Sequence, residues 1–219
     1  MEETIIIILI ISLFVALAGV LVWFGKKQEK LRSQDIRSMA KRLGFTHEER
    51  VDRALVDTRD YNLFNKGGSK KVKNYLSKES RHGITQYYDY SYVVSTGQST
   101  QIHHHSIVNF RMDGMNVPRF RLLPENLFDK IGEAFGRQDI DFDDNPEFSD
   151  MFALRGPDED KIRRVFSYPV TRALQNHKGL CIEAGGDEMM IYRRKRLKSD
   201  EIEGFLKDAS EILALFYRA

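Results

Sequence analysis

The chain has a long, unbroken apolar run near its N-terminus. Residues 5–24, IIIILIISLFVALAGVLVWF, carry no charge, and Ser12 is their only polar side chain. At about 1.5 Å of rise per residue, a helix of this length spans roughly 30 Å, the hydrocarbon thickness of a bilayer. The run therefore predicts one transmembrane helix. A cleaved signal peptide is the alternative, because residues 16–18 resemble a cleavage site, but the run continues past them and no positive charge precedes it.

Residues 25–44 predict a basic juxtamembrane helix beyond the span. Apolar positions recur near helical spacing, and Gly44 is suited to end the helix in the left-handed conformation. Seven cations lie in this segment and none precedes the span: Lys26, Lys27, Lys30, Arg32, Arg37, Lys41 and Arg42. Lys and Arg beside a span are retained on the cytoplasmic side. The sequence thus predicts a single-pass inner-membrane protein with its N-terminus outside and a cytoplasmic C-terminal domain.

Four of these cations, Lys26, Lys27, Lys30 and Arg32, are predicted to contact lipid headgroups. A basic side chain close to an anionic leaflet contributes about 1 kcal/mol to membrane binding. The alternative, which the sequence leaves open, is that the charges only set the topology. Cys181 is the only cysteine, so no internal disulfide can form, in keeping with a reducing compartment.

The pattern changes to period two after residue 83. Residues 84–94 and 102–112 alternate as two antiparallel strands around the turn STGQST, and VPRFRLL supplies a third strand. Pro124 fits the first turn of a helix that ends at Gly136. The preceding segment, with Gly67, Gly68 and several lysines, predicts a solvated loop, because it lacks the spacing of a phosphate-binding loop.

The C-terminal part alternates strands and helices. FALRG predicts a strand, residues 157–177 a helix interrupted at Pro169, and GLCIEAGGDEMMIYRR a hairpin. A last helix starts at Ser199 and carries a broad apolar stripe: Ile202, Phe205, Leu206, Ala209, Ile212, Leu213 and Phe216. The predicted fold class is α+β, a single N-terminal transmembrane helix followed by an antiparallel-sheet domain with packed helices. Residues 45–219 form that domain, with a β-rich lobe at 45–123 and an α+β lobe at 124–219 as a subdivision.

The acidic segment 139–150, DIDFDDNPEFSD, resembles a calcium loop. Asp139, Asp141 and Asp143 would be its first metal ligands. Against this, the position that needs glycine is Asp144, and the last ligand is an Asp rather than a Glu. Apolar residues alternate with the acids, so the segment predicts a half-buried strand followed by a turn.

His103 and His105 are the other candidate metal ligands. On a strand they share one face at roughly 6.5 Å, while His104 points to the apolar side. Zinc needs three or four ligands, and no nearby Cys or H-E-x-x-H motif supplies the rest. Exposed histidines on a sheet are therefore the favoured interpretation, and no metal or cofactor is predicted.

No motif for nucleophilic catalysis or nucleotide binding is present. Cys181 lies between apolar neighbours, where a buried thiol is inert. Asp89 in YYDYSY and Glu183 in CIEAGG have surroundings that could raise a pKa, but surface sheet positions explain them equally well. With 34 Lys and Arg against 32 Asp and Glu, the positive excess is too small to indicate nucleic-acid binding.

Four segments, YDYSY, FRLLPE, DIDFDDNPEFSDMFALRG and CIEAGGDEMMIYR, carry a resemblance over about residues 75–195. The sequence resembles a widespread group of uncharacterised bacterial proteins with one N-terminal membrane helix and a cytoplasmic α+β domain. The resemblance implies a structural role for the acidic segment, with Phe148 as an anchor in the core. It implies no activity and no active-site residues.

The favoured function is that of a non-enzymatic, membrane-anchored protein whose cytoplasmic domain binds a protein partner, as an accessory or scaffolding subunit of a membrane complex. Tyr87 or the terminal helix is the expected contact. The alternative is a membrane-tethered enzyme or metal-dependent domain that uses His103 and His105 or the acidic segment 139–150.

Overall fold

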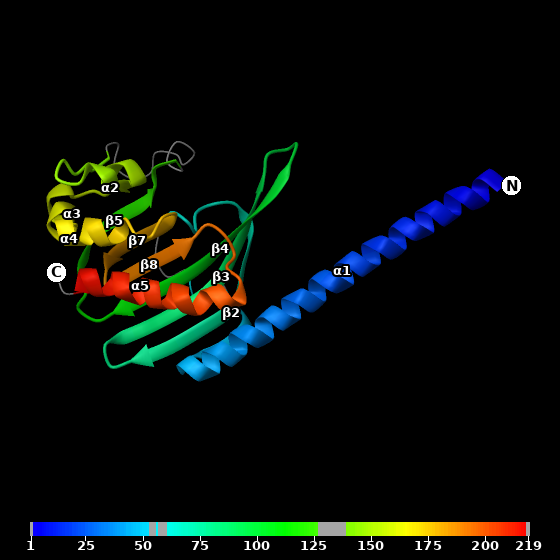
Figure 1. Cartoon of the computed structure of the whole chain (residues 1–219), viewed down its shortest axis with the longest axis horizontal. Coiled ribbons are helices and arrows are strands. Elements are labelled where there is room, and N and C mark those ends of the chain that lie inside the picture. Colours follow the sequence, from blue (N-terminus) through cyan, green and yellow to red (C-terminus); the bar gives the residue numbers. More distant parts are fainter. Residues whose placement is uncertain (1, 53–55, 57–60, 127–138, 218–219) are drawn as a thin grey trace.

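The computed structural model describes residues 2–52, 56, 61–126 and 139–217. Its first element is a single helix, α1 (Glu2–Leu43), which covers both the predicted span and the predicted basic helix. The stretch Ile10–Leu43 has the length and hydropathy of a membrane-spanning helix, and its apolar window is not buried by the rest of the protein. Figure 1 shows α1 projecting far from a compact body. Gly44 ends the helix with a positive φ of 76°, as predicted.

Eight antiparallel strands form one sheet: β1 (Thr46–Val51), β2 (Gly68–Ser80), β3 (Gly83–Ser95), β4 (Thr100–Met112), β5 (Val117–Pro124), β6 (Phe152–Arg155), β7 (Leu180–Gly186) and β8 (Glu188–Arg193). Their order across the sheet is β1-β2-β3-β4-β8-β7-β5-β6. The two segments suggested as lobes contribute to the same sheet, because β4 pairs with β8 and β5 pairs with β7. The predicted fold class, a membrane helix followed by an antiparallel α+β domain, is confirmed.

The prediction of a solvated loop around Gly67, Gly68 and the following lysines is wrong from Gly68 onward, because strand β2 already begins there. Its alternation is broken by two register shifts, one between Gly68 and Lys71 and one between Lys73 and Leu76. Within the second shift, Asn74 adopts a positive φ of 49°. Irregularities of this kind change which face successive side chains occupy, so the sequence shows no clear period of two.

Five short or amphipathic helical segments complete the described part of the body: α2 (Pro146–Met151), α3 (Glu159–Val165), α4 (Tyr168–Leu174), the 3₁₀ turn η3 (Ser199–Glu201) and α5 (Ile202–Tyr217). The seven residues predicted for the apolar stripe of the last helix are all buried. Helix α5 lies across the sheet in Figure 1. The helix predicted to follow Pro124 falls on residues 127–138, which lie outside the described part of the chain.

Both faces of the sheet are buried. The face covered by α1 and α5 carries a core that includes Ile36, Tyr87 and Phe216, whereas the opposite face carries Phe64 and Tyr90 in a second cluster. Tyr87 is fully buried, so the expectation that it forms an exposed partner contact is wrong. Strand β3, which carries Tyr87, is covered on both faces of the sheet. A single sequence does not reveal that both faces are covered.

The acidic segment 139–150 is a turn followed by a short helix, so the predicted strand is wrong. Ile140 and Phe142 are nevertheless buried while Asp141 and Asp143 are exposed, which accounts for the alternating pattern. A backbone hydrogen bond of 2.9 Å, from Ile140 N to Leu154 O, ties this segment to β6. Local contacts with the core replace a full strand ladder.

Phe148 is the buried residue of α2 and packs against three other aromatic rings. Its centroid lies 5.6 Å from those of Phe142 and Phe152 and 6.2 Å from that of Phe166. The position implied by the resemblance is therefore a core position in the structure. Edge-to-face and tilted aromatic contacts add to the free energy of burial.

We expect Phe148→Ala to lower the free energy of unfolding by about 3–5 kcal/mol, because the substitution leaves a cavity among rings that cannot fully collapse into it. Denaturant unfolding of the full-length protein in detergent, followed by circular dichroism, measures the loss. Phe148→Leu keeps most of the volume and should lose clearly less. Equal, small losses for both variants would contradict a well-packed aromatic cluster here.

Candidate functional site

A buried carboxylate marks the place where α1 meets the sheet. Asp89 lies in the middle of β3, opposite Lys73 on β2 and Ser106 on β4. The Arg32 guanidinium of α1 donates two hydrogen bonds to this carboxylate, at 2.5 and 3.1 Å. The side chains of Arg32 and Asp89 are only 14% and 7% exposed, so the pair is shielded from water. Bidentate pairing of this kind fixes orientation as well as charge.

Neutral donors fill the remaining acceptor positions of Asp89. The Tyr87 hydroxyl, the Ser106 hydroxyl and the Asn74 amide donate at 2.9, 3.0 and 2.9 Å. Burial is the main cause that raises the pKa of Tyr87, and the charge of Asp89 adds to it. The phenol therefore stays protonated and remains a donor. A buried charge needs such partners to offset its lost hydration.

A second carboxylate, Glu29, extends the network along α1 toward the apolar run of this helix. Arg196, which follows β8, contacts it at 2.6 Å and also lies 3.5 Å from Asp89. Lys73 pairs with Glu29 at 3.2 Å. The hydrogen bond from Arg196 is the main cause that lowers the pKa of Glu29 to about 2. We call these five residues, Glu29, Arg32, Lys73, Asp89 and Arg196, the junction cluster.

The junction cluster ties α1 to segments far apart in the sequence. Arg32 also donates to the carbonyl oxygen of Leu197, at 2.8 and 3.2 Å. The backbone N–H of Leu197 in turn donates to the Ser106 hydroxyl at 3.0 Å. Apolar contacts support the charged ones, because Ile36 and Ala40 of α1 are almost completely buried. The body is thus fixed to the helix that projects from it.

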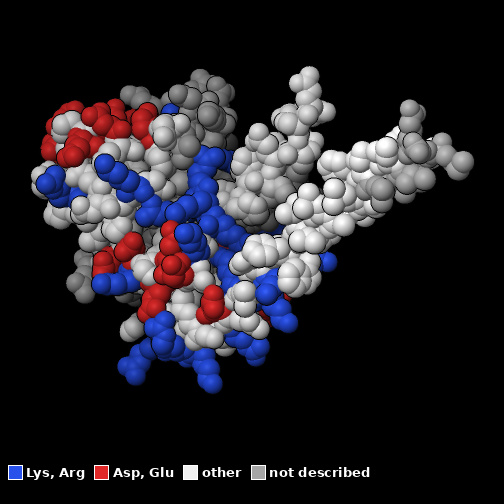
Figure 2. All heavy atoms as spheres, turned by 45° about the vertical axis from the view of Figure 1, so that its right-hand side comes forward, with Lys and Arg blue, Asp and Glu red and all other residues white. Residues whose placement is uncertain are grey.

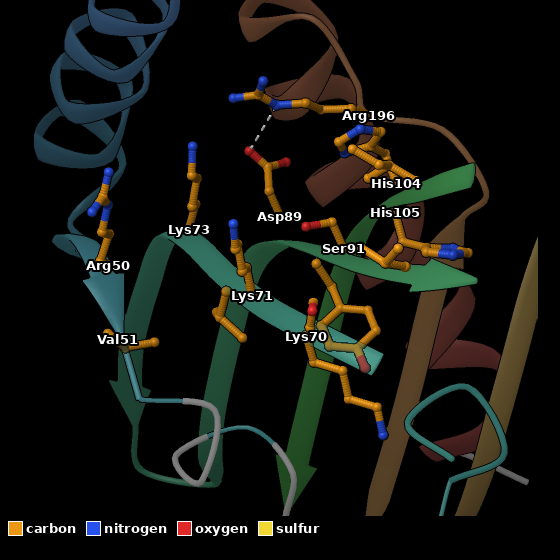
Figure 3. A pocket seen from close by; sticks show the side chains of 15 residues that line it. Arg50, Val51, Lys70, Lys71, Lys73, Asp89, Ser91, His104, His105 and Arg196 are labelled. Atoms are coloured by element: carbon orange, nitrogen blue, oxygen red, sulfur yellow. Dashed lines mark ion pairs between the residues drawn. The ribbon is translucent and has the colours of Figure 1, made fainter. Parts of the chain in front are cut away.

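A pocket of about 530 Å³ opens beside the junction cluster. Strands β2, β3 and β4 form its floor, and Arg50 and Arg196 contribute to its edges. Figure 3 shows Lys71 and Lys73 pointing into the same space as Asp89 and Arg196, whereas Lys70 points the other way. The Lys70 ammonium donates to the carbonyl oxygen of Phe64 on the opposite side. Among the described residues that line this pocket, Asp89 is the only carboxylate.

The surface around the pocket is positively charged. In Figure 2, Lys and Arg side chains form a band across the body that reaches the base of α1, while the described side chains on the projecting part of α1 are uncharged. A partly enclosed space with cations on its walls focuses a positive potential and concentrates anions. The arrangement is suited to binding an anionic group.

A second buried carboxylate, Glu183, lies on the opposite face of the sheet. It accepts hydrogen bonds from the Asn62 N–H at 2.7 Å and the Tyr192 hydroxyl at 3.1 Å, and Arg121 lies 3.8 Å away. Burial raises the pKa of Glu183. Burial, followed by the charges of Arg121 and Arg194, lowers the pKa of Lys66 to about 8. These contacts hold the segment at 61–66 against the sheet.

The predicted histidine arrangement is partly wrong. His105 is buried rather than exposed, and its ring stacks on Tyr92 at a centroid distance of 5.5 Å. Burial is the main cause that lowers its pKa to about 3, so it is neutral at physiological pH. The His103 ring also stacks on Tyr92, at a centroid distance of 5.0 Å. His104, predicted to face the apolar side, is exposed and lines the pocket.

The acidic side chains considered as metal ligands do not lie close to one another either. Asp139 lies 3.5 Å from Arg155, whereas Asp141 and Asp143 are exposed. Asn145, in the same segment, is buried, and its side chain forms hydrogen bonds with Thr171 and Gln175. Across the residues that the structure describes, no group of three or more His, Cys, Asp or Glu side chains is placed to hold a metal ion.

Cys181 is fully buried in β7, and burial raises the pKa of its thiol to about 12. The prediction of an inert buried thiol is confirmed. At neutral pH almost none of it is thiolate, which is the reactive form.

The fold is similar to that of a transport factor. The crystal structure of the mycobacterial trehalose monomycolate transport factor A, TtfA, superposes with a TM-score of 0.58 over 85% of this chain and 92% of that chain. The sequence identity is 10%, so the likeness to TtfA concerns the fold alone. No protein-family model and no curated protein sequence matches this chain.

Sequence reasoning found parts of the junction but not the junction itself. Asp89 was a candidate without a partner, and Arg32 was assigned to the membrane surface, although the structure pairs the two. Headgroup contact by Lys26, Lys27 and Lys30 stays a prediction. Glu29 and Arg196 were missed, because they lie 167 positions apart and no local pattern joins them. The charged residue inside a tyrosine-rich strand was the one usable signal.

We expect Asp89→Asn to lower the free energy of unfolding by about 3 kcal/mol, because it leaves Arg32 without its buried counter-charge. Chemical denaturation of the full-length protein in detergent measures the change.

A matched control removes another ion pair between α1 and the body. Glu203 accepts two hydrogen bonds from Arg42, yet these side chains are 47% and 60% exposed. Exposed pairs are weakened by water and salt, so Glu203→Gln should leave the unfolding midpoint nearly unchanged. If Asp89→Asn were as mild as this control, the junction would not stabilise the fold.

Proposed function

We propose that this protein is a single-pass, membrane-anchored accessory protein whose folded body binds a protein partner within a membrane complex. The observation that carries the proposal is the junction cluster, which fixes the body to the helix that emerges from the bilayer. The likeness to a transport factor is in keeping with an accessory role at a membrane. The partner belongs to the membrane or to its surface on the side of the body.

The rigidity of the junction is informative about function. A flexible linker would be enough if anchoring only had to keep the body near the membrane, because tethering by itself raises the effective concentration. Here α1 continues without a break from Glu2 to Leu43, and Arg32 and Glu29 pair with the body. This arrangement holds the height and tilt of the body above the bilayer. Such control is useful when particular faces must meet a second membrane component.

The cations after the span support an inner-membrane protein with its body in the cytoplasm. Lys26, Lys27 and Lys30 follow the apolar run, and no Lys or Arg precedes it. The positive-inside rule assigns the side with these charges to the cytoplasm. Exposed Lys161 would then lie inside the cell, and Thr4 outside the membrane on the other side.

This orientation can be tested with single introduced cysteines, because the native Cys181 is buried and unreactive. In intact spheroplasts, a membrane-impermeant thiol reagent should label Thr4→Cys but neither Lys161→Cys nor the wild type. After permeabilisation Lys161→Cys should be labelled as well, and the wild type should stay unlabelled as the control. Labelling of Lys161→Cys in intact spheroplasts would place the body outside and overturn the orientation.

Partner binding predicts that a membrane protein co-purifies with the tagged full-length protein after crosslinking in native membranes. An insertion of about ten Gly and Ser residues between Gly25 and Lys26 separates the body from the span without changing either part. We expect recovery of the partner to fall about tenfold, because the fixed geometry and its effective concentration are lost.

The control carries the same insertion between Ala219 and the tag and should recover the partner as the wild type does. Absence of any reproducible membrane partner, or equal recovery from all three proteins, would count against the proposal. Stoichiometric zinc or calcium in the purified protein would instead favour the metal-dependent alternative.

A further inference from the structure

The pocket beside the junction cluster lies at the height of the lipid headgroups. Glu29, which contacts Lys73 and Arg196, comes five residues after Phe24, the end of the apolar run. Five residues of helix correspond to about 7.5 Å along its axis. The headgroup region is about 5–8 Å thick on each side of the hydrocarbon. The cations at this end of the pocket therefore lie close to the level of lipid phosphates.

The pocket and its surroundings carry a surplus of positive charge. Asp89 is already shared between Arg32 and Arg196, and Glu29 between Lys73 and Arg196. Arg50 and Lys71 add two further cations, and both are exposed. Neither forms an ion pair with a carboxylate among the residues that the structure describes. Arg and Lys side chains around one space bind phosphate oxygens through charge-assisted hydrogen bonds.

The β3–β4 hairpin forms the other side of the pocket and is unusual in composition. From Tyr90 to Phe110 the chain has no Asp, Glu, Lys or Arg, although 30% of all residues are charged. Ile102 on this hairpin is 60% exposed and lines the pocket together with Val93. In Figure 2 the hairpin is an uncharged projection beside the uncharged part of α1.

The hairpin is long enough to reach the bilayer. Asp89 and Arg32 touch, so they give a common starting point on β3 and α1. From Asp89 the strand continues for six residues to Ser95, about 20 Å, whereas the apolar run of α1 starts eight residues from Arg32, about 12 Å. Figure 1 shows the hairpin extending beyond the sheet on the side toward which α1 projects. An uncharged tip avoids the cost of placing charges in the interface.

We propose that this pocket binds the phosphate-containing headgroup of an anionic membrane lipid, with Arg50 and Lys71 facing the phosphate and the β3–β4 hairpin lying against the lipid in the same bilayer. Ile102 and Val93 contact the apolar part of the lipid just above its headgroup. The site depends on membrane anchoring but not on the protein partner, so its failure would leave the co-purification test unaffected.

The test uses full-length protein in detergent and three probes: short-chain phosphatidylglycerol, short-chain phosphatidylcholine and inorganic phosphate. Native mass spectrometry measures how much of each probe binds. We expect phosphatidylglycerol to bind more tightly than the other two. The double variant Arg50→Gln/Lys71→Gln should weaken its binding about tenfold or more, because each basic side chain contributes to anionic-lipid binding.

The matched control, Lys161→Gln/Lys207→Gln, removes the same charge from exposed positions on α3 and α5, and should bind phosphatidylglycerol as the wild type does. Lys26, Lys27 and Lys30 are unchanged in every variant, so the difference between the pairs reports on the pocket. Unchanged circular dichroism and melting without lipid confirm that the variants fold.

Ile102→Thr distinguishes a lipid from a soluble phosphate, because it keeps the β-branched shape and removes the apolar contact. It should weaken phosphatidylglycerol binding and leave that of inorganic phosphate unchanged. Equal lipid binding by the pocket and control variants would overturn the proposal. So would inorganic phosphate that binds as tightly as phosphatidylglycerol, or phosphatidylglycerol binding that Ile102→Thr leaves unchanged.

Discussion

The buried ion pair between Arg32 and Asp89 is the contact on which the arrangement of this protein depends. It joins a helix that emerges from the apolar span to the inner strand β3 of the sheet, where both groups are shielded from water. A buried charge is tolerated only when its partners offset the lost hydration, and Asp89 has five of them around its two oxygens. Removing any of these partners therefore affects the position of α1 as well as the sheet.

The same charges also shape the surface of the body beside the base of α1. Arg196 and Lys73 face both Glu29 on the helix and the pocket on the sheet. Their position is set by the packing of Ile36 and Ala40, which holds α1 against the face that carries Asp89. A structural junction and a cationic pocket thus share residues. The anchoring, the proposed partner binding and the proposed lipid site all depend on the way α1 packs on the sheet.

The two faces of the sheet have different roles. On the face covered by α1 and α5, charged and aromatic contacts connect the membrane helix to the core. On the opposite face, Glu183 and stacked tyrosine and histidine rings hold the segment at 61–66 in place. His105 illustrates how strongly burial decides chemistry: enclosed by Tyr92 and Tyr192, it is neutral and contributes shape rather than metal binding.

The sequence by itself determined the elements whose signal is local. The apolar run, the stripe of α5, the β7–β8 hairpin and the inert Cys181 depend on composition or on a period within one segment, and these are confirmed in the structure. Tertiary structure decided the pairing of Asp89 with Arg32, the burial of Tyr87, the irregular strand β2 and the meeting of Glu29 with Arg196. Partners 57 to 167 residues apart leave no periodic trace in a single sequence, because their contact arises from strand order and helix docking rather than from spacing along the chain.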